Sequence, residues 1–358
     1  MSTNIKAQHR MRSLLETVIQ QGASDLHLSV GSYPTIRING SLVPLTQDSQ
    51  LTKEESAELI FSFMTDIQRE KLEKDRSVDF SFAVEDKARF RCNIFYQMGV
   101  VSGAYRLISS KIKTVEELNL PPVIHEFAKL SQGLVLFVGP TGHGKSTSMA
   151  ALIDEINHNR TEHIVTIEDP IEYMYRQDRS IINQREVYYD VPSFNDGLRA
   201  AFREDINVLL VGEMRDLETI SAAITAAETG HLIFSTLHTN DSWQTIDRII
   251  DVFPGFQQNQ IRSQLASVLV GIVSQRLLPK VGGGRIPAIE ILLKNDAVEN
   301  LIREGQTHQI INILETNTDI GMQSINRALA GMVKDELIAL EDAERYATDR
   351  SMLHMLLR

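Results

Sequence analysis

Hydrophobic and polar positions alternate in two ways along the first part of the chain. Apolar residues recur at helical spacing over residues 11–19 and at every second position over 26–30, 36–38 and 78–84. The first pattern predicts an amphipathic helix. The other three predict strands with one buried and one solvent-facing side, as in antiparallel sheets. We therefore expect residues 1–110 to form a small α+β domain.

The pattern changes after a polar stretch, residues 111–122, which ends in two prolines and predicts a linker. Short apolar runs then alternate with helical stripes, which is typical of an α/β fold with a doubly wound parallel sheet. Residues 123–358 are predicted to form this second domain, mostly helical after about residue 257 apart from a hairpin tip at 282–284. The four runs are LVLFV at 134–138, HIVTI at 163–167, NVLLV at 207–211 and LIFST at 232–236.

A glycine-rich stretch, GPTGHGKST, follows the first of these runs. It matches the pattern G-x-x-x-x-G-K-[ST], whose backbone N–H groups surround the phosphates of a nucleotide. The lysine contacts the β- and γ-phosphates, and Ser146 can bind Mg²⁺. His143 stands at a variable position, where we expect a solvent-facing residue. The predicted nucleotide-binding residues of the loop are Gly139, Pro140, Thr141, Gly142, His143, Gly144, Lys145, Ser146 and Thr147.

Acidic residues follow two of the other runs. Glu213 comes after the run at 207–211, and Glu168 with Asp169 comes after the run at 163–167. The carboxyl ends of parallel strands meet at one edge of the sheet, where ligands bind in such folds. We expect Glu213 to face the phosphate loop directly and to bind Mg²⁺, and Glu168, one strand across, to polarise the attacking water.

Two histidines flank the last run, in TGHLIFSTLHTN at 229–240. His231 precedes the strand and His238 follows it, so at about 3.3 Å per residue they should lie roughly 20 Å apart at opposite edges. His238 is a candidate donor to the γ-phosphate. His231 is interpreted as a structural residue or a subunit contact.

Three arginines of the first domain are predicted to share one sheet surface. Arg89 and Arg91 alternate with the apolar residues of KARFRCNIFYQ, and Arg106 lies on the next run. The pattern by itself fits either a solvated face or a surface that binds anions.

Composition narrows the classes of function. The formal net charge of -11 argues against a surface built to hold a nucleic-acid backbone. Cys92 is the only cysteine, which excludes an intrachain disulfide and a four-cysteine zinc site. The first residues lack the apolar centre of a signal peptide, and no apolar stretch is long enough for a membrane span. A cytoplasmic location is expected.

Together these motifs resemble the secretion ATPase superfamily, most closely the PilT family of twitching-motility ATPases, which power type IV pilus retraction. The resemblance implies a PAS-like N-terminal domain, a RecA-like ATPase domain, ATP as substrate and a homo-hexamer. It also implies a pilus platform protein as partner, at the cytoplasmic face of the inner membrane. It is carried by GASDLHLSVG (22–31), the phosphate loop, IEDPIEY (167–173), GLRAAFREDINVLLVGEMRD (197–216), TGHLIFSTLHTN and NLIREGQTHQI (300–310).

The resemblance also implies roles for residues outside the loop. Arg89, Arg91 and Arg106 match N-domain arginines that approach the phosphates in relatives. A segment comprising Asn300, Leu301, Ile302, Arg303 and Glu304 matches a motif that we expect to couple hydrolysis to retraction. The chain departs from the family's pattern at Ile206-Asn207 and at Val298-Glu299, and the second departure puts the role of position 299 in doubt.

Two other functions stay open on sequence grounds. RecA-like domains also serve nucleic-acid motors, although the acidic balance opposes this. A regulatory subunit that binds ATP is the third candidate, against which the full set of site residues counts.

Overall fold

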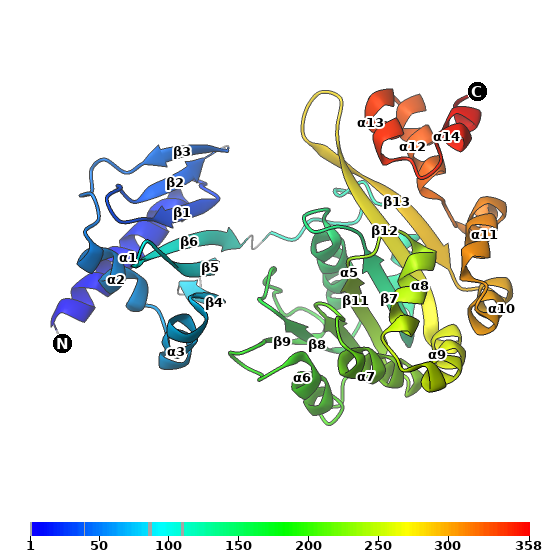
Figure 1. Ribbon diagram of the computed structural model, residues 1–358, viewed down its shortest axis with the longest axis horizontal. Helices are drawn as coiled ribbons and strands as arrows, with labels where there is room; N and C mark the ends of the chain where they lie inside the picture. Colours follow the sequence, from blue (N-terminus) through cyan, green and yellow to red (C-terminus); the bar gives the residue numbers. More distant parts are fainter. Residues whose placement is uncertain (1, 39, 85–87, 109–110) are drawn as a thin grey trace. The chain divides into compact units, whose positions relative to one another are not determined.

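The computed structural model of the protein describes residues 2–38, 40–84, 88–108 and 111–358 (Figure 1). The chain divides into two compact units. Unit 1 comprises Met1–Lys111 together with Asp169–Met174, and unit 2 comprises Ile112–Glu168 and Tyr175–Arg358. Residues 109 and 110, where the first domain was predicted to end, lie outside the described residues.

Unit 1 is an antiparallel sheet with helices packed against it. Its strand order is β3-β2-β1-β6-β5-β4. One core joins the apolar side of the first helix, including Met11 and Leu15, to Leu26 and Phe90 of the sheet. This part of the chain is α+β, as the alternating patterns predicted. Its elements are α1 (Ser2–Gln20), β1 (Asp25–Leu28), β2 (Thr35–Ile38), β3 (Ser41–Pro44), α2 (Lys53–Phe61), α3 (Asp66–Asp75), β4 (Ser77–Val84), β5 (Ala88–Gln97) and β6 (Val100–Ile108).

Unit 2 is built on a sheet with the order β13-β12-β7-β11-β10-β8-β9. All neighbouring strands in it are parallel except β12 and β13, which form an antiparallel hairpin. The α/β prediction is confirmed. The sequence predicted the glycine tip of the hairpin, but neither β9 nor the place of β12 beside β7. The strands are β7 (Gly133–Val138), β8 (His163–Glu168), β9 (Ile181–Glu186), β10 (Val208–Val211), β11 (Leu232–Leu237), β12 (Leu269–Pro279) and β13 (Arg285–Leu293).

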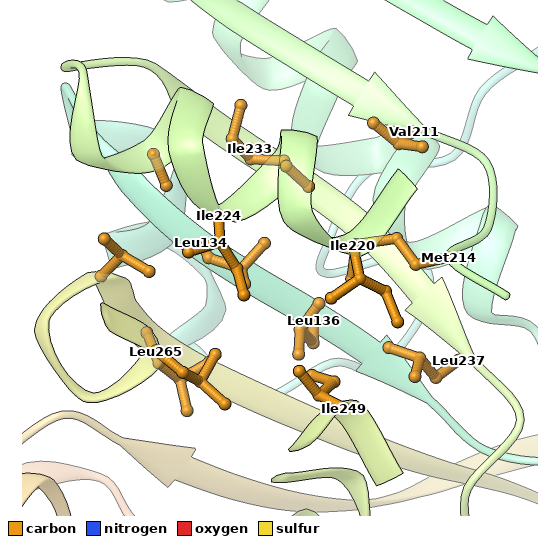
Figure 2. Packing of buried hydrophobic residues seen from close by; sticks show 14 of the residues in the cluster. Leu134, Leu136, Val211, Met214, Ile220, Ile224, Ile233, Leu237, Ile249 and Leu265 are labelled. Atoms are coloured by element: carbon orange, nitrogen blue, oxygen red, sulfur yellow. The ribbon is translucent and has the colours of Figure 1, made fainter. Parts of the chain in front are cut away.

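Helices cover both faces of this sheet, which explains why β7, β10 and β11 are buried at every position. On one face, Leu134 and Leu136 of β7 pack with Ile220 of α7 and Leu265 of α9 (Figure 2). On the other, Val135 and its neighbours pack with α4 and α5. The helices are α4 (Ile124–Lys129), α5 (Lys145–Asn159), α6 (Phe194–Ala201), α7 (Leu217–Glu228), α8 (Ser242–Asp251) and α9 (Gly255–Val268).

Local polar residues start several of these helices. The side chain of Asp216 accepts a hydrogen bond from the backbone N–H of Thr219 at the start of α7, and Asp241 caps α8 in the same way through Gln244. Such caps satisfy backbone donors that have no partner inside the helix. They therefore fix where each helix begins at the edge of the sheet.

The predicted linker, 111–122, is not a free connection along its length. Val115 and Leu120 are 2% and 6% exposed and belong to the core that also contains Phe127 and Val135. Residues from Ile112 onward accordingly belong to unit 2. The sequence analysis did not predict this packing, because Val115 and Leu120 stand among mostly polar residues.

Beyond the hairpin the chain is helical, as predicted. Leu278 and Ile286 of the hairpin share a separate small core with Leu329 and Leu353 of the last helices. The elements of this part are α10 (Asp296–Glu304), η1 (Thr307–Gln309), α11 (Ile310–Thr316), η2 (Thr318–Ile320), α12 (Ile325–Lys334), α13 (Leu340–Tyr346) and α14 (Arg350–Leu357).

Candidate functional site

The phosphate loop, residues Gly139–Gly144, connects β7 to the N-terminus of α5. Gly139, Gly142 and Gly144 have φ values of 139°, 80° and 86°. These are backbone conformations that favour glycine. A Cβ at Gly139 would also lie 2.4 Å from the carbonyl oxygen of Gln275, so a side chain has no room there. The loop thus exposes backbone N–H groups at the positive end of α5, an arrangement suited to phosphate.

Lys145 is the first residue of α5 and is 7% exposed. Its Nζ donates hydrogen bonds to the carbonyl oxygens of Gly139, at 2.7 Å, and Pro140, at 3.0 Å. The ammonium group is therefore held across the loop, while Ser146 and Thr147 follow it in the first turn of the helix. Thr141 and Gly142 are exposed at the loop's tip.

His238 lies between the loop and the acid of the neighbouring strand. Its Nδ1 is 3.4 Å from Lys145 Nζ and 3.4 Å from Thr141 Oγ1, and its Nε2 is 3.7 Å from Glu213 Oε2. Burial and the charge of Lys145 lower the pKa of the imidazole. The ring is therefore neutral at neutral pH, so that Nδ1 accepts from the lysine and Nε2 carries the proton toward Glu213.

Glu213 does not face the phosphate loop directly, contrary to our expectation. Strand β11, which ends just before His238, lies between β7 and β10. Glu213 pairs with Arg215 at 2.7 Å. Both side chains also line a cavity of about 350 Å³ with His238 and Arg248. The strand order thus makes the histidine the link between the loop and this carboxylate.

Glu168 ends β8, one strand beyond β10, as predicted. Because β8 is three strand positions from β7, the two strand axes are about 14 Å apart. The carboxylate accepts a hydrogen bond from Thr166 Oγ1 at 2.7 Å and lies 3.5 Å from Gln184 Nε2 of β9. Asp169, the next residue, begins the segment that belongs to unit 1.

His231 lies at the amino end of β11, the opposite end from His238, as the spacing predicted. Its Nδ1 is 3.0 Å from the carbonyl oxygen of Ala226 and 3.2 Å from Thr229 Oγ1. Its ring centre is 6.2 Å from that of Phe202. These contacts join the end of α7 to the start of the strand.

His143 is not a solvent-facing loop residue, and this expectation was wrong. The side chain is half-buried, and its Nδ1 accepts a hydrogen bond of 2.9 Å from the backbone N–H of Leu277 on β12. Burial, followed by the charges of Arg276 and Lys145, lowers the pKa of His143. The partner could not be foreseen because it is 134 residues away in the sequence.

The three arginines of unit 1 share one face of its sheet, as predicted. Arg91 is directly opposite Arg106 across β5 and β6. Arg106 pairs with the buried Asp25 at 2.9 Å, and Arg89 donates to Ser81 at 2.7 Å. Within the same unit, Arg91 lies 3.4 Å from Glu172. All three guanidinium groups are thus oriented by polar neighbours.

Comparison with known proteins identifies the family. The family model described as type II/IV secretion system protein matches residues 4–283, which is more than half of the chain. The chain belongs to this family.

Individual relatives are similar over most of their length. The type IV pilus retraction ATPase PilT of Pseudomonas aeruginosa is 45% identical over 93% of this chain and 97% of its own. A twitching motility protein of Neisseria gonorrhoeae is 44% identical over 88% of this chain and 84% of its own. A crystal structure of the pilus retraction motor PilT with bound ADP has a TM-score of 0.89 and 47% identity, covering 96% of this chain and 98% of that one. The fold is therefore that of a secretion ATPase, with an N-terminal domain and an ATPase domain.

A second cavity of the protein, of about 310 Å³, lies beside the phosphate loop. The sequence analysis did not predict it. It is lined by Gly144 and Thr147 of the loop and first helical turn. The other walls come from distant parts of the chain, so no local motif marks them. They include Leu118, Leu120, Gln275, Leu277, Arg285 and Pro287.

The residues at the sheet edge fit a magnesium ion bound together with phosphates. Mg²⁺ in such sites keeps several waters and takes only one or two protein oxygens. The hydroxyl of Ser146 and the carboxylate of Glu213 are oxygen donors of this kind. Among the described residues, no cluster of three or more His, Cys, Asp or Glu side chains could hold a metal ion by itself.

The segment 300–304 lies in α10, which is capped by Asn295 and ended by the left-handed Gly305. Ile302 is buried, and Leu301 packs at the margin of the same core. Glu299 pairs with Lys294 at 3.3 Å and Arg303 at 2.6 Å. The helix is amphipathic, so packing alone already explains part of its sequence.

Proposed function

We propose that this chain is an ATPase motor that powers retraction of type IV pili. The observation that carries the proposal is the series of contacts from Lys145 through His238 to Glu213. It connects polar side chains at the ends of two neighbouring strands to the phosphate loop. The similarity to retraction ATPases over 93% of the chain supports the mechanical role. ATP hydrolysis is the reaction, and pilus retraction is the work that it drives.

ATP binds with its phosphates in the loop and its base in the neighbouring cavity. Backbone N–H groups from Gly142 to Ser146 and the ammonium of Lys145 neutralise the phosphate charge. Leu118, Leu120 and Pro287 offer apolar walls to a flat base, and the walls also include Arg285. This assignment uses a cavity that adjoins both the loop and the hairpin.

Ser146 and Glu213 would hold Mg²⁺. When bound, the ion neutralises charge on the β- and γ-phosphates. When ATP is bound, the neutral His238 would donate its Nε2 proton to the γ-phosphate instead of directing it to Glu213. We assign activation of the attacking water to Glu168, whose carboxylate is oriented by Thr166. The direct rival is Glu213, which is one strand closer to the loop.

The working form would be a homo-hexameric ring in which Arg89, Arg91 and Arg106 approach a nucleotide at a subunit boundary. Such a site changes as domains rotate, which is how hydrolysis could drive movement. Asn300 to Glu304 would couple this movement to the pilus machine. Within the described part of the chain, none of the helices combines the length and apolar character needed to cross a bilayer. We place the ring at the cytoplasmic face of the inner membrane, against a platform protein of the pilus.

Retraction scored by microscopy in a strain that lacks this gene tests the proposal. Wild-type protein should restore retraction, whereas Lys145→Ala, produced at the same level, should not. Restoration by Lys145→Ala would contradict an ATP-driven role. The nucleic-acid motor is tested in the same purified samples, because stimulation of ATPase activity by DNA or RNA would favour it over the pilus function.

A further inference from the structure

We propose that Gln275 of β12, together with His143, is a positioning residue that holds the phosphate loop in the shape that binds ATP. The inference rests on the proposed function of the loop as the ATP site. It concerns the contacts between the loop and strand β12 of the hairpin. No motif in the loop itself reveals these contacts.

Gln275 lies against both ends of the loop, with its backbone at the first glycine and its side chain at the last. The Cβ of a residue replacing Gly139 would lie 2.4 Å from its carbonyl oxygen, and one replacing Gly144 would lie 2.7 Å from its Nε2. The side chain is 3% exposed, and its Oε1 accepts a hydrogen bond of 2.8 Å from Ser148 Oγ in the first turn of α5. The side chain of this buried glutamine therefore holds the point where the loop enters the helix, while its backbone packs where the loop leaves the sheet.

Strand register explains why a support is needed at this position. The ladder between β7 and β12 ends with Val138 opposite Ser274. From Gly139 onward the loop has left this ladder, while β12 continues alongside β13 to Pro279. Gln275, the first residue past the end of the ladder, continues the attachment of β12 through its side-chain hydrogen bond with Ser148 at the other end of the loop.

His143 makes a second contact between the same two segments. Leu277 donates its backbone N–H to His143 Nδ1 at 2.9 Å. The imidazole can accept only if Nδ1 carries no proton. The lowered pKa of His143 keeps that nitrogen available at neutral pH. The loop's variable position is thus occupied by a residue whose acceptor reaches β12.

The expected effect is on nucleotide affinity rather than on chemistry. A loop that is held in place before ATP arrives needs no ordering during binding, whereas a freed loop is competent for only a fraction of the time. Losing one net hydrogen bond should weaken ATP binding roughly 3- to 10-fold. Once ATP and Mg²⁺ have ordered the loop, turnover should be little changed.

Gln275→Leu in the full chain tests this, with KM and kcat for ATP and the equilibrium Kd measured together. KM and Kd should rise roughly 3- to 10-fold, with kcat within about twofold of wild type. Ser148→Ala should do the same, and the double variant should be no worse than the more severe single variant because both remove one bond. His143→Ala should also raise KM, whereas His143→Asn, which keeps an acceptor near Nδ1, should restore it.

Ser274→Ala is the matched control, since Ser274 is buried on the same strand but donates to Asn240 O rather than to the loop. An equal rise in KM in this control would overturn the inference, as would a Gln275→Leu enzyme with unchanged KM. If Gln275→Leu does not fold, Ser148→Ala and His143→Ala carry the same predictions from the loop side. Lys145→Ala tests the ATP site separately from its support by Gln275 and His143. ATP binding of wild-type strength in that variant would refute the assignment of the loop as the ATP site.

Discussion

Lys145 and His238 lie 3.4 Å apart at the carboxyl edge of the sheet, although 93 residues separate them in the sequence. The contact exists because β11 is inserted between β7 and β10. It brings the lysine of the phosphate loop, a neutral imidazole and the Glu213 carboxylate into one line. Through these contacts, a change of charge at the phosphates would alter the electrostatic environment of Glu213, which follows β10.

Lys145→Ala should reduce ATP turnover by at least about 100-fold, the scale for losing a group that stabilises charge in the transition state. Steady-state phosphate release measures this. The thermal unfolding midpoint should change little, because the lysine bonds loop carbonyls rather than the core. Lys280→Ala, at an exposed lysine near the hairpin tip, is the control and should turn over normally.

Glu168→Gln and Glu213→Gln should fail differently. Loss of the proposed water-activating carboxylate at Glu168 should leave ATP binding near normal and slow single-turnover hydrolysis by about 100-fold or more. Glu213→Gln should weaken Mg²⁺-dependent turnover, and raising the Mg²⁺ concentration should recover part of it. Side-by-side binding and single-turnover measurements make the comparison.

Normal hydrolysis by Glu168→Gln would move the base to Glu213, the rival that lies closer to the loop. In that case Thr166 and Gln184 would be holding Glu168 for a structural purpose. Thr166→Val offers an independent check, because it removes the hydroxyl that donates to Glu168 Oε1 and leaves the carboxylate in place.

His125 makes stability depend on pH. Its Nδ1 lies 2.8 Å from Glu155 of α5 and its Nε2 lies 2.9 Å from Glu116, so both ring nitrogens must donate and the ring must be protonated to keep both bonds. The hydrogen bond to Glu155, followed by the charges of Glu155 and Glu116, raises the pKa of His125 above 6.5. His125 lines a cavity of about 390 Å³, whose other titratable residues besides Glu116 and Glu155 are Lys113, Asp154 and His158.

Because the folded pKa is raised, the stabilisation is complete below pH 6.5, the unfolded value, and is lost as pH rises through the folded pKa. Thermal unfolding followed from pH 5.5 to 8.5 should show wild type losing stability relative to His125→Gln as the pH increases. A constant difference across this range would contradict the role of protonation. Limited trypsin digestion at Lys113 should accelerate over the same range as residues 112–120 loosen.

Leu301→Ala on α10 should impair retraction more than hydrolysis. The side chain is only partly buried, so a modest loss of stability is expected. The measurement is ATPase rate in vitro against retraction speed in cells at matched protein levels. Ile311→Ala, at a half-exposed position on α11, controls for loss of apolar surface. Equal losses of hydrolysis and retraction for Leu301→Ala would leave no separate coupling role.

The proposed hexameric ring predicts how mixtures of two inactive variants should behave. Light scattering should give the mass of a hexamer in the presence of ATP. Lys145→Ala and Arg91→Ala should each be inactive alone. Mixed rings should recover part of the activity, because an intact phosphate loop can meet an intact arginine from a neighbour. A mixture with no more activity than its components would place the arginine and the loop in the same subunit's site.

Much of the protein follows from local sequence. Runs such as LVLFV and VLLV predict buried strands because every position is apolar, and GPTGHGKST predicts its own turn because glycines permit its backbone angles. The acids and histidines that follow the runs must then lie at known ends of their strands. The phosphate loop, both carboxylates and the separation of His231 from His238 were therefore predictable without a structure.

Tertiary structure decided what lies beside what. A strand that is apolar on both sides carries no mark of its neighbours, so the order β12-β7-β11-β10-β8 could not be derived from the pattern. That order places His238 between Lys145 and Glu213, and it brings Gln275 and Leu277 against a loop more than 120 residues away. The sequence determined which groups the site contains, because motifs are local. Only long-range strand pairing, which depends on packing of the whole sheet, determined how those groups are supported.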